Sequence, residues 1–256
     1  MSSPLFLADY AHGIRLTNVI HLFDITHDFS QPSDVSVSDD GLIYVLDGVN
    51  NKVKVFDKNG KFRLSFGSKG ASRGRFMFPL GIDVDSSGLV YVADSGNHRV
   101  QVFTPEGKYL KQFMLPNDIN PSDPTDVIAD RDHNRLFVAD NDNHYILVFD
   151  LETTELLDTL GEPGAEETQF RYPFLLAQCS DHYIYITDVI NTRVQAFTHE
   201  GKFVKVIGGW GVDKGRFFRP KGVAIDKDNR IYISDSYMGV IQVFTHDGDF
   251  NSALGE

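Results

Sequence analysis

A ten-residue pattern that recurs five times constrains the fold of this chain more than any other feature. It opens with aspartate, runs through a polar turn and ends in an apolar, β-branched run closed by phenylalanine, as in Asp94–Phe103 (DSGNHRVQVF). The five opening residues are Asp47, Asp94, Asp140, Asp188 and Asp235, so by subtraction they lie 47, 46, 48 and 47 residues apart. A constant period of this length indicates that one supersecondary unit is used repeatedly.

Each repeat is predicted to form four short strands. In the second repeat these strands cover residues 81–85, 89–93, 99–103 and 109–113. They are rich in β-branched and aromatic residues and are bounded by Gly, Asp, Asn and Pro, as hairpins require. No segment of helical length has a 3.6-residue apolar period. A four-stranded antiparallel sheet repeated in this way is typical of a β-propeller blade.

The repeats predict an all-β, six-bladed β-propeller of four-stranded antiparallel blades, in a single domain covering residues 1–256. Five complete repeats are expected at about 32–78, 79–123, 124–172, 173–219 and 220–256. Residues 1–31 are expected to contribute three strands to an incomplete closing blade, at Leu5–Asp9, Gly13–Thr17 and Ile20–Ile25. Either that blade closes with three strands, or the chain belongs to a longer protein.

Composition restricts the partners. The formal net charge is -12, which makes nucleic acid and anionic membranes poor partners, and no apolar run approaches the ~20 residues of a membrane span. The single cysteine, Cys179, excludes an internal disulfide framework.

The compartment is left open, because Met1–Leu7 lacks the features of a signal peptide. An extracytoplasmic location is favoured if a signal peptide has been removed. We expect a monomer or a module of a longer chain.

The polar turns and the segments between repeats resemble the NHL-repeat family of β-propellers. The named Asn-His-Leu signature corresponds to Asn97-His98-Arg99 and, nearby, to Asn143-His144-Tyr145. Glycine-rich linkers that end in Arg-Phe and proline, at residues 67–79 and 208–220, agree with the same family. The resemblance covers nearly the whole chain and implies the propeller fold, but propellers carry unrelated activities.

Two activities of that family fit this chain poorly. In its amidating lyases, metal-binding histidines stand at positions that correspond here to Ser33, Leu80, Thr125, Phe174 and Lys221. In its RNA-binding branch a basic face contacts the nucleic acid, whereas this chain has an excess of acids.

The recurring aspartates are interpreted as structural, since a catalytic residue is needed once and these occur in every repeat. Each is expected to accept backbone N–H bonds at the end of its strand, with Lys52, Arg99 or Arg193 adding a charge-assisted bond.

Binding residues are expected where the loops depart from the repeat, because loops on a rigid scaffold carry function. We therefore predict a non-catalytic module that binds a protein or small ligand without a cofactor, through Tyr145, Tyr172, Phe174, Trp210, Arg219, Lys221, Tyr237 and Met238. The alternative is a metal-dependent lyase or hydrolase. Its divalent metal would lie in the central channel, and the candidate ligands are Asp34, Asp83, Asp126 and Asp226.

Overall fold

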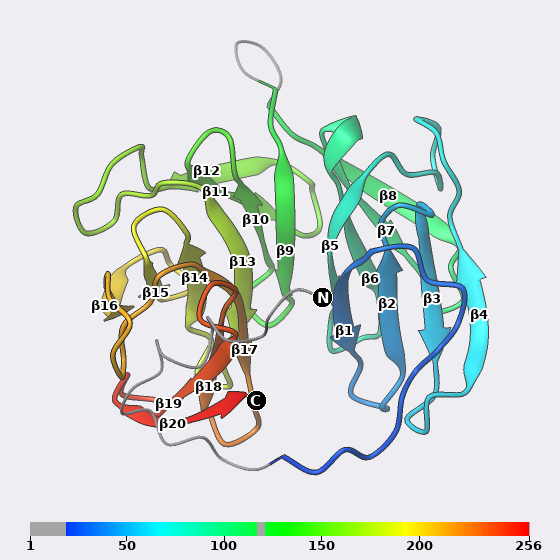
Figure 1. Cartoon of the computed structure of the whole chain (residues 1–256). Helices are drawn as coiled ribbons and strands as arrows, with labels where there is room; N and C mark the ends of the chain where they lie inside the picture. The colour runs from blue at the N-terminus through cyan, green and yellow to red at the C-terminus, as the bar shows by residue number, and fades with distance from the viewer. Residues whose placement is uncertain (1–18, 117–120, 256) are drawn as a thin grey trace, which may run out of the picture. The chain divides into compact units, whose positions relative to one another are not determined.

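A computed structural model describes residues 19–116 and 121–255. These residues divide into two compact units, one covering 21–160 and the other containing 161–255. The described segments form twenty β-strands in five four-stranded antiparallel sheets, three in the first unit and two in the second (Figure 1). Over the same segments, no helix has the length and apolar character needed to cross a membrane.

The first unit contains three sheets. The first sheet comprises β1 (Pro32–Val37), β2 (Ile43–Asp47), β3 (Lys52–Phe56) and β4 (Phe62–Phe66). The second comprises β5 (Pro79–Val84), β6 (Val90–Asp94), β7 (Arg99–Phe103) and β8 (Tyr109–Met114). The third comprises β9 (Pro124–Asp130), β10 (Arg135–Asp140), β11 (Tyr145–Asp150) and β12 (Leu156–Leu160).

The second unit contains two sheets of the same kind. One comprises β13 (Pro173–Gln178), β14 (Ile184–Asp188), β15 (Arg193–Phe197) and β16 (Phe203–Gly208). The other comprises β17 (Pro220–Ile225), β18 (Ile231–Asp235), β19 (Val240–Phe244) and β20 (Phe250–Gly255). In all five sheets, strands that follow one another in sequence are neighbours, so the predicted four-stranded antiparallel blades are confirmed.

The alternation of β6 shows how the blades of the first unit share their core. Val90 and Val92 pack in a cluster with residues of the first sheet, whereas Tyr91 and Ala93 pack in a cluster with residues of the third. Successive side chains of a strand point to opposite faces, so an apolar strand of this kind needs a covering layer on each side. The unbroken apolar sequence of β6 is therefore a consequence of stacking one blade between two others.

The turn that precedes the third strand of each blade has left-handed backbone. His98 has a φ of 53°, and the matching residues Asn51, His144 and Thr192 have φ values of 54°, 62° and 54°. The fifth blade places Gly239 there, with a φ of 67°. The histidine of the signature motif thus occupies a turn position that asparagine or glycine can also fill.

One predicted strand is wrong. Ile20–Ile25 has no regular secondary structure, and its exposed Ile20 and Leu22 are 85% and 82% accessible. The other two strands predicted before Pro32, Leu5–Asp9 and Gly13–Thr17, lie outside the described residues.

Candidate functional site

The recurring aspartates are buried and accept several hydrogen bonds each. Asp94 is fully buried, and its carboxylate accepts bonds from the Met77 backbone N–H (2.7 Å), Asn97 Nδ2 (2.9 Å) and Arg99 Nε (2.8 Å). The backbone bond recurs in the other blades, with Ser30 to Asp47, Asp123 to Asp140, Arg171 to Asp188 and Phe218 to Asp235. Each carboxylate therefore ties the end of its second strand to the linker that enters the blade.

Cations reinforce three of these corners. Arg99 and Arg193 contact Asp94 and Asp188 as predicted, but in the first blade the partner of Asp47 is Lys54 (2.7 Å) rather than Lys52. Lys52 and Lys54 are two residues apart and share one face of β3, but Lys54 is buried further along the strand, whereas Lys52 is exposed at its first position.

The pKa values of two corner carboxyls differ in direction. Burial acts to raise the pKa of Asp47, but hydrogen bonds from Lys54, Asn50 and Ser30 outweigh it and lower the pKa. Burial raises the pKa of Asp188, and its bonds only partly offset this effect. In both cases the carboxylate is occupied by the protein's own donors, an arrangement that stabilises backbone and leaves no open position for a substrate.

Two acids on the first strands of the blades have different surroundings. Asp34 on β1 accepts the backbone N–H of Ile82 on β5 at 2.8 Å, and Asp83 on β5 accepts that of Ala129 on β9 at 2.9 Å. Burial raises the pKa of Asp34 to about 7, with a contribution from Asp83, and raises that of Asp83 to about 6. These carboxyls link neighbouring blades and titrate near neutral pH.

Of the other two predicted metal ligands, Asp126 also lies on a first strand and Asp226 does not. Asp126 is buried on β9, where its carboxylate accepts the backbone N–H of Val127. Asp226 follows β17 in a turn, paired with Arg230 at 2.7 Å and bonded by the Tyr232 hydroxyl. Placing Asp226 on a first strand was wrong, because β17 ends at Ile225 and the acid belongs to the next turn.

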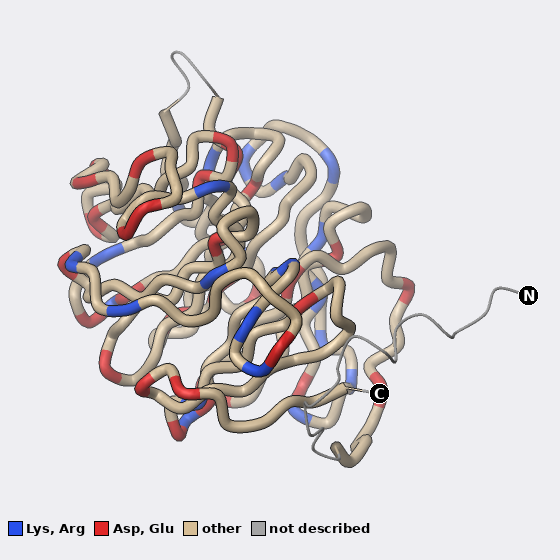
Figure 2. Tube along the Cα trace, turned by 60° about the vertical axis from the view of Figure 1, so that its left-hand side comes forward, with Lys and Arg blue, Asp and Glu red and all other residues tan. Residues whose placement is uncertain are grey.

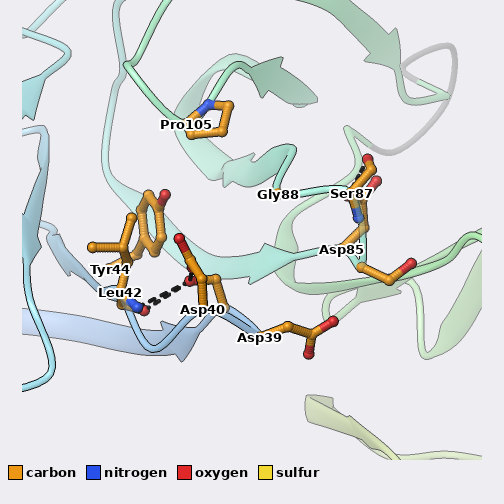
Figure 3. Close-up of a pocket in the computed structure, with 10 residues that line it drawn as sticks. Asp39, Asp40, Leu42, Tyr44, Asp85, Ser87, Gly88 and Pro105 are labelled. Atoms are coloured by element: carbon orange, nitrogen blue, oxygen red, sulfur yellow. Dashed lines mark hydrogen bonds between the residues drawn. The ribbon is translucent and has the colours of Figure 1, made fainter.

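Two cavities lie in the first unit. One, of about 460 Å³, is lined by Ile25, Phe29, Pro32, Ser33, Asp34, Val35 and Val45. The other, of about 260 Å³, lies between turns of the first two blades and is lined by Asp39, Asp40, Tyr44 and Asp85 among others (Figure 3). Asp85 in the second cavity is already bonded to Ser87, Tyr91 and Arg131.

In the second unit, aromatic and basic side chains of the predicted binding loops are exposed. Trp210 is 75% accessible, Tyr172 is 45% and Tyr237 is 39%. Arg219 is also exposed, and Phe174 and Lys221 are partly exposed. We refer to Tyr172, Phe174, Trp210, Phe218, Arg219, Lys221 and Tyr237 as the aromatic–cation patch.

Contacts connect four members of the aromatic–cation patch in two pairs. Tyr237 stacks on Phe218 with ring centroids 4.0 Å apart, and Lys221 Nζ lies 4.5 Å from the centroid of the Phe174 ring. The linker that carries Trp210 pairs with Phe217, the residue before Phe218. The two pairs thus hold together residues that are distant in sequence.

Two residues predicted for the binding loops are placed differently. Met238 is only 5% exposed, since it packs in a small cluster with Val240 and Ala253. Tyr145 belongs to the first unit, and its hydroxyl interacts with Asp140, which together with burial raises its pKa. Phe218 was not among the residues predicted for binding, because a phenylalanine next to the recurring Phe217 is typical of a residue that packs in the linker. Its stacking partner, Tyr237, is distant in sequence.

Comparisons with known proteins agree with the blade architecture. The NHL repeat family matches residues 29–56 and 76–103, and the family described as a 6-bladed beta-propeller (DUF5128) matches residues 166–255. No curated protein matches the chain.

Several solved structures share the fold at low sequence identity. Virginiamycin B lyase from Staphylococcus aureus is 15% identical with a TM-score of 0.65, over 88% of this chain and 69% of that one. A hydrazine synthase from Kuenenia stuttgartiensis is 14% identical with a TM-score of 0.61, over 90% and 81%. A protein of unknown function from Bacteroides caccae is 12% identical with a TM-score of 0.65, over 88% and 81%. Strand order, repeat spacing and both family matches agree in supporting an NHL-repeat β-propeller.

Proposed function

We propose that this protein is a non-catalytic binding module whose aromatic–cation patch contacts a protein or small-molecule ligand. The observation that carries the proposal is the exposure of three large aromatic side chains in loops of one unit, with Trp210 75% accessible, Tyr172 45% and Tyr237 39%. Large aromatic side chains are costly to leave in water, and together with arginine they are the residues most enriched in binding hot spots.

The surroundings of the patch support the same function. Its loops rise from two adjacent four-stranded sheets, so the contact residues are positioned before a ligand arrives. A preorganised surface loses little conformational entropy on binding. The corner carboxylates Asp188 and Asp235 of the same unit hold these loops through backbone N–H groups of Arg171, Phe218 and Arg219.

The experiment uses Trp210 as a built-in reporter, because it is the single tryptophan of the chain. Peptide and metabolite libraries would be titrated into the protein while its tryptophan emission is followed. A ligand of the patch should shift the emission, and its affinity should fall at least tenfold when Arg219 and Tyr237 are both replaced by alanine, the loss of about 1.4 kcal/mol expected for hot-spot residues.

Control variants separate the patch from the rest of the surface. Replacing the exposed Lys58 and Arg63 of the first unit by alanine should leave binding unchanged. If ligands bind the Arg219 and Tyr237 double variant as tightly as the unmodified protein, the placement of the site is wrong.

A second candidate function is a metal-dependent lyase or hydrolase acting at the first strands of the first unit. The observation that favours it is the pair of partly buried carboxyls, Asp34 and Asp83, with pKa values of about 7 and 6. Such values suit general acid–base catalysis, and a bound cation would relieve the buried charge. Asp34 also lines the cavity of about 460 Å³. Virginiamycin B lyase shows that a protein with this fold can be a lyase.

Elemental analysis of the purified protein tests this second candidate. A stoichiometric divalent metal that is lost in Asp34→Asn and Asp83→Asn would support it. Purified protein that neither contains nor takes up Mg²⁺, Mn²⁺, Ca²⁺ or Zn²⁺ would contradict the metal-dependent mechanism.

A further inference from the structure

The loops that form the aromatic–cation patch have the opposite charge to the chain as a whole. Residues 171–174, 210–221 and 236–239 contain five cations, Arg171, Lys214, Arg216, Arg219 and Lys221, against one acid, Asp213. The whole chain has 24 Lys and Arg against 36 Asp and Glu, and Figure 2 shows acidic positions spread along the trace. The loops that expose the aromatic rings therefore carry a local excess of positive charge.

Two cations of the patch have no acidic partner among the residues that the structure describes. Among the described residues, neither Arg219 nor Lys221 has an acidic side chain within ion-pair distance, although Arg99, Arg131 and Arg193 each have one. Lys221 instead lies over the Phe174 ring, which holds its ammonium group in place. Uncompensated cations in an otherwise acidic protein provide electrostatic complementarity for an acidic ligand.

Acids also mark one border of the patch. The linker before Arg171 carries Glu162, Glu166 and Glu167, and all three are exposed. An acidic ligand would be repelled from this linker and would lie toward Trp210 and Lys221. The charge pattern thus restricts the ligand to one part of the surface.

We infer that the patch binds an acidic peptide segment that carries aromatic or large apolar side chains, an inference that rests on the proposed function. Carboxylates of the segment would pair with Arg219 and Lys221, and a planar guanidinium binds carboxylate in bidentate fashion. An apolar side chain of the segment would cover Trp210 and the stacked pair of Tyr237 and Phe218.

A nucleic acid is the competing class of ligand, because bases stack on aromatic rings and phosphates bind cations. The net charge of -12 disfavours it, since a long polyanion extends beyond five cations and meets the surrounding acids. A short acidic peptide can be matched in length to the patch. Single-stranded RNA therefore serves as a comparison ligand in the test.

The test compares synthetic probes of equal length on the full chain. The probes are a Glu/Asp peptide with central Phe and Leu, its Gln/Asn analogue, its Lys analogue, a Glu/Asp peptide without apolar residues, and oligouridylate. Affinities would be measured by Trp210 emission and by calorimetry at about 50 and 150 mM salt, where screening lengths differ. We expect the acidic apolar peptide to bind at least tenfold more tightly than the other probes. Its affinity should fall as the salt concentration rises.

Variants test the charge pairing in both directions. The double variant Arg219→Glu with Lys221→Glu should lower the affinity for the acidic peptide at least tenfold. Arg219→Lys should lower that affinity by a smaller factor. Asp213→Asn removes the one acid of these loops and should strengthen binding about two- to threefold. A gain of affinity cannot be caused by misfolding. Lys58→Glu with Arg63→Glu is the control on the first unit and should have no effect.

The outcomes separate this inference from the proposed function. If the neutral or basic peptide, or a library ligand without negative charge, binds best and depends on Trp210 and Tyr237, the patch is a binding site but the acidic ligand class is wrong. If oligouridylate binds more tightly than the acidic apolar peptide, the class of macromolecule is wrong. If neither these probes nor any library ligand responds to substitutions in the patch, both proposals fail.

Discussion

Arg99 donates from Nε to the carboxylate of Asp94 across 2.8 Å, and both side chains are almost completely buried. Arg99 also donates from Nη2 to the carbonyl oxygens of Ser72 and Arg75 in the linker. The pair therefore joins the end of β6, the start of β7 and the entering linker by one network. An ion pair of this kind is sensitive to loss of either member, because the other is left buried and unmatched.

Replacement of Asp94 by asparagine should destabilise the protein by about 3 kcal/mol, since Arg99 would remain buried without its counter-charge. The free energy of unfolding in urea measures the effect. Asp39→Asn, an exposed change, should stay within about 0.5 kcal/mol of the unmodified protein. Equal effects of the two substitutions would contradict the structural role of the corner.

Tyr91 and Tyr185 occupy matching positions but differ in their hydroxyl contacts. Tyr91 donates to Asp85 at 3.0 Å, whereas Cys179 takes the place of that acid in the fourth blade and the buried Tyr185 hydroxyl has no partner among the described residues. Tyr91→Phe should lower the free energy of unfolding by about 1 kcal/mol, and Tyr185→Phe should leave it unchanged or raise it. Thermal unfolding of both variants checks the difference, and a larger loss for Tyr185→Phe would show that its hydroxyl has a partner.

Stability should fall as pH rises from about 4 to 7 through the titration of Asp34. Its pKa is raised from 3.8 to about 7 by burial, so the folded state holds its proton over a range in which the unfolded state has lost it. Asp34→Asn should flatten the dependence of the melting temperature on pH in this window and stabilise the protein at pH 8. Asp57→Asn is the control, because the pKa of Asp57 is lowered by backbone N–H bonds and it titrates below the window. An unchanged slope in Asp34→Asn would contradict the raised pKa.

Gly81 allows close approach of β5 and β9. A Cβ atom at this position would lie 2.5 Å from the Asp126 Cα and 2.7 Å from the Thr125 carbonyl oxygen, which are backbone atoms that cannot rotate away. Gly81→Ala should therefore lower the free energy of unfolding by at least about 2 kcal/mol. Gly41→Ala meets no atom closer than 3.5 Å and introduces only left-handed strain, of about 1 kcal/mol. Urea unfolding ranks the two, and the reverse order would contradict the packing of β5 against β9.

Much of the blade could be predicted from the sequence because its determinants are local and repeated. The aspartate at the end of each second strand, the polar turn and the apolar third strand recur within a few residues of each other, and strand pairing in a meander joins neighbours in sequence. Ile20–Ile25 shows the limit of this reasoning: it is apolar enough for a strand, but an apolar segment does not by itself supply a pairing partner.

The candidate site could be predicted in part. Trp210, Tyr172 and Tyr237 were identified as departures from the repeat, and the structure exposes them. Met238 was misplaced because a turn residue can point inward as easily as outward, and this choice depends on the neighbours that cover it. The choice of Lys54 over Lys52 likewise depends on the segment that covers Lys54, whose ammonium group donates to the carbonyl oxygens of His27 and Asp28.

By itself, the sequence determined the blade, its period and its antiparallel order, because these follow from hydrogen bonding and side-chain alternation between residues close along the chain. Tertiary structure alone decided which side chains are buried, which cations lack a counter-charge and which carboxyls titrate near neutral pH. Those properties depend on solvent exclusion and on partners from distant segments, such as Ile82 for Asp34 and Phe218 for Tyr237.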